Sequence, residues 1–264
     1  MANLKRKNHY LPVCYQRGFT DSTEKVWVKF ADRAEPEHRQ PLTVGRKRSL
    51  YIWTQAGAPN DKVEDFFNEH VETPFAALSQ RIKSERHEFA SIGDEECGTL
   101  CRFVASQTMR TLAHRATIDL QAGRRVDTNT FVRVMLRKII ALLDSWIENR
   151  PEIYFHTCLP FVGEQFITGD SPVLVVQTND NPIWVPTDTP TLKITDVQEI
   201  VANRQHRLWL ALSPYVAVSI QGFGGGGVHL PPRTEEPSFI RNFNKMIRGQ
   251  SQIFTLAKDK PYLS

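Results

Sequence analysis

The stretch TFVRVMLRKIIALLDSWIENRPEIYFHTCL, Thr130 to Leu159, changes its hydrophobic period at Pro151. Before the proline, apolar residues recur at helical spacing, which predicts a helix over about 128–149 whose stripe serves packing. After the proline the period is two, as in strands that bury one face. The helical stripe consists of Phe131, Met135, Ile139, Leu142, Leu143 and Trp146.

The chain beyond Pro151 is a series of short β-rich runs separated by Pro, Gly, Asn and Asp. Runs joined by turns of a few residues favour an antiparallel or mixed sheet over repeated strand-helix-strand units. A last helix is expected over about 238–249, before a closing strand QIFTL. The other runs are IYFHTCL, QFITGD, VLVVQT, IWVP, LWLAL and VAVSI.

The chain before Pro151 is predicted to be largely helical. VWVKF (26–30) and LYIW (50–53) indicate two early strands. A helix is expected to begin near Asp61 and to be kinked by Pro74, and a second should run over about 94–121.

These elements predict an α+β fold, with a helical layer of three longer helices packed on an antiparallel or mixed sheet. The sheet should be formed mainly by the C-terminal half. We expect a single domain over 1–264, with its helical part at about 61–149 and its sheet part at about 151–264.

Composition points to a globular protein without a membrane partner. Hydrophobic residues make up 41% of the 264 residues, and no apolar run is long enough to span a bilayer. The first residues are basic and lack the apolar core of a secretion signal, so we expect a cytoplasmic location. Four cysteines are too few for a disulfide framework. Cys97 and Cys101, one helical turn apart, have no second pair with which to complete a zinc site.

Charge is distributed unevenly along the chain. The net charge is +4, but residues 1–50 contain eleven Lys or Arg against five Asp or Glu, so this segment carries +6 and the remainder −2. Such asymmetry attracts nucleic acid or another polyanion. The alternative is an ordinary solvated surface.

The helix predicted over about 94–121 changes chemistry along its apolar face. Leu100, Phe103 and Val104 are followed at the same spacing by Gln107 and Arg110, and then by Thr111 and His114. A buried amide or guanidinium is unfavourable unless its polar atoms are paired, so a polar partner or a cleft should face it. The alternative is that the helix leaves the core near residue 107.

The run FITGDSPV, 166–173, presents Asp170 where a strand ends. Rigid strands position catalytic groups well, so Asp170 is a candidate metal ligand or base. The alternative is a structural turn in which the carboxylate binds its own backbone.

The opening stretch KNHYLPVCYQRGF, 7–19, places His9, Gln16 and Arg17 among apolar residues. Pro12 is able to start a short helix there. Nearby basic residues disfavour a protonated His9, which would leave a neutral ring able to act as a base or ligand. A structural, hydrogen-bonded histidine explains the pattern equally well.

At these residues the sequence resembles an uncharacterised, mostly bacterial family, domain of unknown function 4238. The resemblance covers most of the chain and implies that the polar positions belong together, without implying an activity. Gly169 stands where the family usually has Ser. The matching residues are Asn8, His9, Tyr10, Pro12, Tyr15, Arg17 and Phe19, then Glu64 and Glu72, then Gln107 and Arg110, and finally Thr168, Gly169, Asp170 and Pro172.

The first functional hypothesis is a metal-dependent hydrolase, a phosphodiesterase or nuclease in a toxin or phage-defence setting. Asp170 and Glu72 would hold Mg²⁺ or Mn²⁺, for which carboxylate oxygens are suitable ligands. Arg110 would stabilise phosphate charge, Gln107 would orient substrate or water, and His9 would act as general base or acid. No recognised nuclease or phosphate-loop signature is present.

Two alternatives come from other classes of protein. One is a non-catalytic module in which Arg110, Gln107 and His9 recognise nucleic acid or another anionic ligand and the basic residues 1–50 provide long-range attraction. Arg17 and Glu72 are further candidate binding residues. The other is a structural interaction protein whose polar residues form a buried network.

Overall fold

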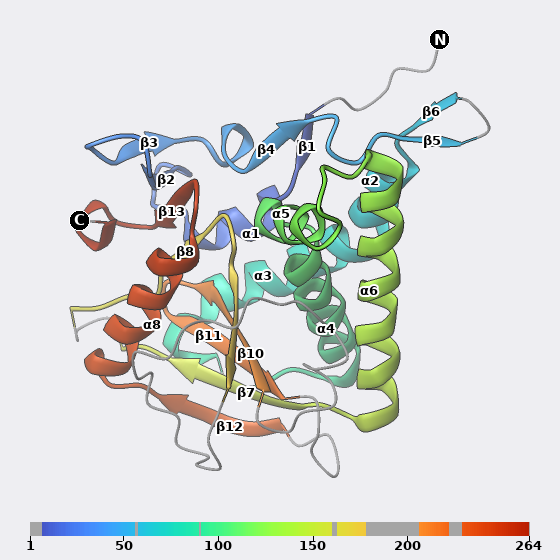
Figure 1. The fold of residues 1–264 in the computed structure, drawn as a ribbon. Coiled ribbons are helices and arrows are strands. Elements are labelled where there is room, and N and C mark those ends of the chain that lie inside the picture. The colour runs from blue at the N-terminus through green and yellow to red at the C-terminus, as the bar shows by residue number, and fades with distance from the viewer. Residues whose placement is uncertain are drawn as a thin grey trace.

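The protein has an α+β fold in which a central five-stranded sheet lies between α8 on one side and a layer of helices ending in α6 on the other (Figure 1). The structure is a computed structural model and describes residues 7–55, 58–89, 91–159, 163–177, 206–221 and 229–263. The fold class predicted from the sequence is confirmed.

The five-stranded sheet confirms the change of period at Pro151. The edge strand β12 runs parallel to its neighbour β7, and the other neighbouring strands are antiparallel. The run IWVP (183–186) lies outside the described residues. In spatial order the strands are β12 (His229–Thr234), β7 (Glu152–Thr157), β11 (Val216–Gln221), β10 (His206–Ser213) and β9 (Val173–Gln177).

A second, four-stranded sheet joins the two ends of the chain, because the closing strand β13 pairs with β2 from the N-terminal part. The strand predicted over 26–30 is confirmed as β2. In order the strands are β3 (Glu37–Arg39), β2 (Val26–Phe30), β13 (Phe254–Ala257) and β8 (Thr168–Gly169).

Two short ribbons complete the strands. The first pairs β1 (Lys7–His9) with β4 (Arg46–Arg48), and the second pairs β5 (Trp53–Gln55) with β6 (Ala58–Asn60). The strand predicted over 50–53 is wrong, since Leu50 and Tyr51 lie buried in a turn and the strand begins at Trp53.

Helices α3 and α4 pack against each other and touch the five-stranded sheet, and α6 packs on α4. Their shared core includes the stacked rings of Phe75 and Phe103, with Tyr15 at 5.5 Å from Phe103. The helices are α1 (Val13–Gln16), α2 (Lys62–Phe67), α3 (Thr73–Glu85), α4 (Asp94–Met109), α5 (Leu112–Gln121), α6 (Thr128–Asn149) and α8 (Pro237–Gln250). Short 3₁₀ turns cover Arg17–Phe19, Pro41–Thr43, Arg86–Glu88 and Lys260–Leu263.

Two helix predictions need correction. The helix expected over 94–121 is broken between α4 and α5, with Arg110 at the end of one and Thr111 capping the other. The helix with Pro74 contains a π-helical turn, Asn68–Glu72, immediately before the proline, which lies in the first turn of α3. Proline is tolerated in a first turn because its missing N–H is not needed there. Within the part of the chain that is described, no helix has the length and apolarity that a bilayer crossing requires.

Candidate functional site

The break between α4 and α5 directs Arg110 into the interior. Arg110 has φ −93° and ψ 7°, outside the helical region, and the Thr111 hydroxyl accepts a hydrogen bond of 3.1 Å from the backbone N–H of His114 to start the next helix. Arg110 is completely buried. The break between α4 and α5 therefore sets the direction of the Arg110 side chain. The helical spacing of the sequence does not reveal this break.

Every nitrogen of the Arg110 guanidinium has a protein partner. It donates at 2.8 Å to the Glu72 carboxylate, at 2.6 Å to the backbone carbonyl of His9 and at 3.4 Å to the hydroxyl of Tyr51. The Tyr51 hydroxyl in turn donates to the Arg110 carbonyl at 2.8 Å, and the guanidinium lies 4.2 Å from the ring centre of Phe67. These contacts compensate the loss of hydration that burial imposes.

Electrostatics keep this buried group charged. Burial by itself disfavours the charged form of the guanidinium and lowers its pKa. The neighbouring Tyr51 and Glu72 have the larger combined effect, so the pKa of Arg110 lies above its usual range. Glu72 ends the π-helical turn and keeps a partly exposed carboxylate. Arg110 and Glu72 thus form an internal ion pair, and the donors that a phosphate would need are already in use.

The imidazole of His9 lies at the outer edge of this group. Its Nε2 is 3.1 Å from the carbonyl oxygen of Leu42, an acceptor, so Nε2 carries the proton of the neutral ring and Nδ1 does not. Burial is the main cause that lowers the pKa of His9, and the charges of Arg110 and Arg46 lower it further. The hydrogen bond to the Leu42 carbonyl and the charge of Glu72 act in the opposite direction. The neutral His9 predicted from the sequence agrees with these contacts.

Gln107 lies one helical turn before Arg110 and is also completely buried. Neither its amide oxygen nor its amide nitrogen has a hydrogen-bond partner in the part of the chain that is described. His114 is buried as well, and burial lowers its pKa to about 3. The alternative in which this face leaves the core is therefore wrong. The buried polar residues of the face are Gln107, Arg110, Thr111 and His114.

Asp170 belongs to a different set of contacts. One carboxylate oxygen accepts the backbone N–H groups of Ile253 and Phe254, at 3.2 and 3.3 Å, and the other has no partner among the described residues. Burial raises the pKa of Asp170, although these hydrogen bonds oppose the rise. The negative charge of Asp170 contributes to raising the pKa of Tyr10, the neighbour of His9. Asp170 is therefore close to the opening stretch.

A small residue is required beside Asp170. A Cβ atom built on Gly169 would overlap the hydroxyl of Ser251 and would lie 3.0 Å from the carbonyl oxygen of Phe254. The glycine thus allows β8 and the chain before β13 to approach closely.

Hydrogen bonds connect the separate motifs. The buried hydroxyl of Tyr15 lies 2.7 Å from that of Thr168 and donates to the carbonyl of Ala211 at 2.7 Å. The side-chain oxygen of the buried Asn8 accepts the backbone N–H of Tyr51 at 3.3 Å. Tyr51 was not a candidate from the sequence, because its run was interpreted as a strand.

The structure brings some predicted site residues together and separates others. His9, Glu72 and Arg110 meet in one group, whereas Arg17 is exposed on the turn after α1. Glu72 and Asp170, the predicted metal ligands, bind different partners. Within the described ranges, His, Cys, Asp and Glu side chains form no group of three or more suited to a metal ion. Binding of Mg²⁺ or Mn²⁺ stays a prediction.

A second polar cluster was missed by the sequence analysis. His156 on β7 places Nδ1 2.7 Å from the carboxylate of Glu235 and Nε2 3.0 Å from the hydroxyl of Ser219 on β11. This order of carboxylate, imidazole and hydroxyl is that of a serine-hydrolase triad. Ser219, however, has no exposed surface, and the rings of Trp209 and Phe239 lie against the imidazole. We interpret the cluster as a structural hydrogen-bond chain.

The ribbon of β1 and β4 carries several exposed cations beside the Arg110 group. Lys7 pairs with Arg48, and His9 with Arg46, so these four side chains share one face of the ribbon. Lys7, Arg46 and Arg48 are exposed, as is Lys47 on the other face. None of these four cations forms an ion pair with another residue of the described ranges.

The comparisons agree with the resemblance found in the sequence. This α+β chain belongs to the family described as "Protein of unknown function (DUF4238)", whose sequence profile matches residues 7–260. No curated protein and no solved structure matches the chain.

Proposed function

We propose that this protein binds nucleic acid through the basic face of the ribbon formed by β1 and β4. The observation that carries the proposal is the register, which aligns Lys7, Arg46 and Arg48 on one exposed face. Exposed cations grouped on one face suit contacts with backbone phosphates, and a two-stranded ribbon is narrow enough for the major groove of a duplex. The excess charge of residues 1–50 adds long-range attraction.

The buried network supports this function by holding the ribbon rigid. Arg110 binds the carbonyl of His9 at the end of β1, and the backbone N–H groups of Tyr10 and Leu11 both donate to the carbonyl of Gly45 before β4. The amide of Gln16 donates to the carbonyls of Leu11 and Val44. A ribbon fixed before binding loses little conformational entropy when it contacts a ligand.

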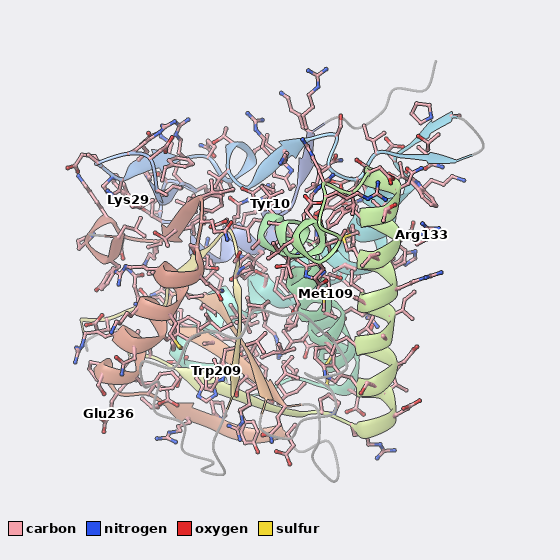
Figure 2. The ribbon with its side chains drawn as sticks, viewed as in Figure 1. Tyr10, Lys29, Met109, Arg133, Trp209 and Glu236 are labelled. Atoms are coloured by element: carbon pink, nitrogen blue, oxygen red, sulfur yellow. The ribbon has the colours of Figure 1, made fainter. Side chains whose placement is uncertain are left out.

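The test compares two sets of variants with equal loss of charge. One replaces Lys7, Arg46 and Arg48 with Ala, and the control replaces the exposed Arg124, Arg133 and Arg137. Figure 2 shows Arg133 on α6, away from the ribbon. Binding to a duplex is measured by fluorescence anisotropy over a salt series. Each lost phosphate contact should make the slope of log K against log salt shallower by about 0.9.

We expect a slope change of about 2 to 3 for the ribbon variant and little change for the control. Equal losses in both variants would mean that diffuse charge, and not the ribbon, attracts the nucleic acid. A flat salt dependence in the unmodified protein would refute the proposal. Heparin as a competitor separates binding of any polyanion from binding of nucleic acid.

The half-buried imidazole on the same face favours a second candidate, hydrolysis of the bound phosphodiester. The unprotonated Nδ1 of His9 is the kind of base that such a reaction uses. Asp170, one of whose carboxylate oxygens has no partner among the described residues, is the residue that we would assign to Mg²⁺ or Mn²⁺. Cleavage of a labelled strand that requires either metal and is lost in His9→Ala would support this candidate. If the protein binds the strand but does not cleave it with either metal, the hydrolysis candidate is rejected and binding remains as the proposed function.

A further inference from the structure

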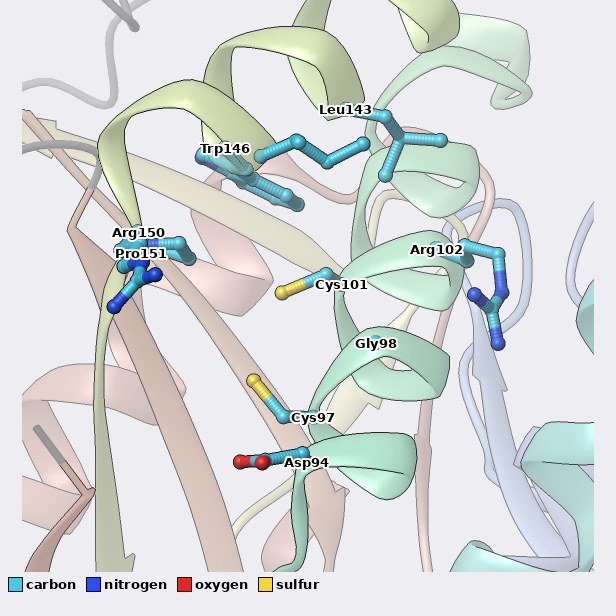
Figure 3. A pocket seen from close by; sticks show the side chains of 10 residues that line it. Asp94, Cys97, Gly98, Cys101, Arg102, Leu143, Trp146, Arg150 and Pro151 are labelled. Atoms are coloured by element: carbon cyan, nitrogen blue, oxygen red, sulfur yellow. The ribbon is translucent and has the colours of Figure 1, made fainter. Parts of the chain in front are cut away.

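A pocket of about 630 Å³ lies between α4 and the end of α6, apart from the ribbon and the Arg110 group. Its walls combine apolar side chains with two thiols, one carboxylate and two guanidinium groups. Figure 3 shows the thiols of Cys97 and Cys101 directed into the same space, with Trp146 above them. The other residues that line the pocket are Asp94, Gly98, Arg102, Leu143, Ile147, Arg150 and Pro151.

The two thiols differ in their surroundings. Cys101 is buried, whereas Cys97 is partly exposed toward the pocket. The neighbouring thiol of Cys101 is the main cause that lowers the pKa of Cys97, and the same interaction raises the pKa of Cys101. Cys97 is also the fourth residue of α4, where the positive end of the helix favours a thiolate. Burial and Asp94 oppose the shift of Cys97 without reversing it.

The chain contains its own unreactive reference thiols. Burial raises the pKa of Cys14 and of Cys158 to about 12. A thiol is far less nucleophilic than a thiolate, so both should react slowly near neutral pH. The pocket thus selects Cys97 among the four cysteines.

The spacing of the pair argues against a disulfide between its members. Residues four apart on a helix have Cβ atoms about 5–6 Å apart. A disulfide needs Cβ atoms about 3.5–4.5 Å apart, so α4 would have to unwind to form one. Cys101 therefore influences Cys97 as a neighbouring thiol and does not act as a resolving thiol.

The wall opposite the thiols carries a cation. Figure 3 shows Arg150 across the pocket from Cys97 and Cys101, and its side chain forms no ion pair within the described ranges. Arg102, on α4 itself, is directed to the other side of the helix, where it donates to the hydroxyl of Thr99. If a sulfur atom of a bound ligand contacted Cys97, the opposite end of the ligand would lie near the guanidinium of Arg150.

We propose that Cys97 is a modification site that forms a mixed disulfide with a low-molecular-weight disulfide whose carboxylate pairs with Arg150. The sulfur of the Cys97 thiolate attacks one sulfur of the incoming disulfide, and a new S–S bond forms as the old one breaks. The departing half leaves as a thiolate and takes a proton from water. The incoming disulfide is the oxidant, and the electron pair leaves with the released thiolate.

The experiment uses the full chain with excess glutathione disulfide as the probe. Intact mass is followed over time from pH 6 to 9, and peptide mapping locates the adduct. We expect one adduct per chain, on Cys97, with a pH midpoint below the value of about 8.5 of an ordinary cysteine. Modification of Cys14 or Cys158 at a similar rate, or a midpoint at the ordinary value, would overturn the proposal.

Four variants separate the contributions. Cys97→Ser should remove the adduct. Cys101→Ala should raise the pH midpoint of adduct formation. Cys101→Ser keeps a polar side chain, so its midpoint should lie between those of the unmodified protein and Cys101→Ala. Arg150→Asn should slow glutathione disulfide several-fold but leave the uncharged bis(2-hydroxyethyl) disulfide unaffected. Asn suits this position because Arg150 has a positive φ of 45°. If Arg150→Asn slowed both disulfides equally, the role of Arg150 would be refuted. Peptide mapping of the unmodified protein tests the assignment to Cys97 without any variant.

Discussion

Arg110 and Glu72 form an ion pair of 2.8 Å in which the arginine side chain has no exposed surface and the glutamate keeps 18%. The pair joins two segments that are distant in the sequence, and the hydrogen bond from Arg110 to the His9 carbonyl adds a third segment. Because no guanidinium nitrogen is left without a partner, the structure favours an anchoring role for Arg110 over direct contact with phosphate.

Replacing Arg110 with Ala should destabilise the protein severely. The change leaves the Glu72 carboxylate and the His9 carbonyl without their donor, and removal of one partner of a buried pair lowers the free energy of unfolding by about 3–5 kcal/mol. Urea unfolding followed by circular dichroism measures the loss. Arg17→Ala, at an exposed arginine near the same segment, is the control and should change stability by about 0.5 kcal/mol or less. Similar values for both variants would contradict the anchoring role.

The carboxyl group of Asp170 should make the protein less stable as pH rises. Burial raises its pKa, so the folded state binds this proton more tightly than the unfolded chain does. The free energy of unfolding therefore falls as pH rises from about 3.9, the ordinary value, to the raised pKa of the folded state. Asp170→Asn keeps an oxygen to accept the N–H groups of Ile253 and Phe254 and does not titrate.

We expect Asp170→Asn to gain stability relative to the unmodified protein as pH rises through this window, as measured by urea unfolding from pH 4 to 8. The difference should then become constant. A difference that does not vary with pH, or one that shrinks as pH rises, would show that the folded state does not raise the pKa of Asp170.

The sequence was informative where a polar residue interrupted an apolar pattern. Gln107 and Arg110 stand out because the face around them is otherwise hydrophobic, and both are buried as this pattern requires. Their partners did not stand out. Arg110 binds a backbone carbonyl, which has no side-chain signature, and Glu72 is one of several acids in its helix.

The remaining features depend on contacts between distant segments. The basic face arises because Lys7 pairs with Arg48, and strands of three residues are too short to show a period. His156 and Ser219 each lie in a run of consecutive buried residues of their strands, so alternation does not distinguish them from their neighbours. Pairing of this kind is determined by packing of the whole fold, which local patterns do not contain.

The hydrogen bonds that join Ser219, His156 and Glu235 should stabilise the fold without catalysing a reaction. Ser219→Ala removes one hydrogen bond of 3.0 Å to the imidazole and should lower the free energy of unfolding by about 1 kcal/mol. Because Ser219 has no exposed surface, a fluorophosphonate probe should not label the folded protein. Labelling that is lost in both Ser219→Ala and His156→Ala would show instead that the cluster is an active site.

The close approach at Gly169 gives a prediction with a built-in rescue. Gly169→Ala introduces a Cβ that overlaps the hydroxyl of Ser251, and forcing atoms into a packed interior lowers stability by about 1–3 kcal/mol. Ser251→Gly removes both side-chain atoms that the new methyl group would meet. The double variant should therefore be more stable than the sum of the single effects predicts, and the double-mutant cycle measures this coupling by urea unfolding. Additive effects would mean that strain against the carbonyl of Phe254, at 3.0 Å, is the dominant obstacle.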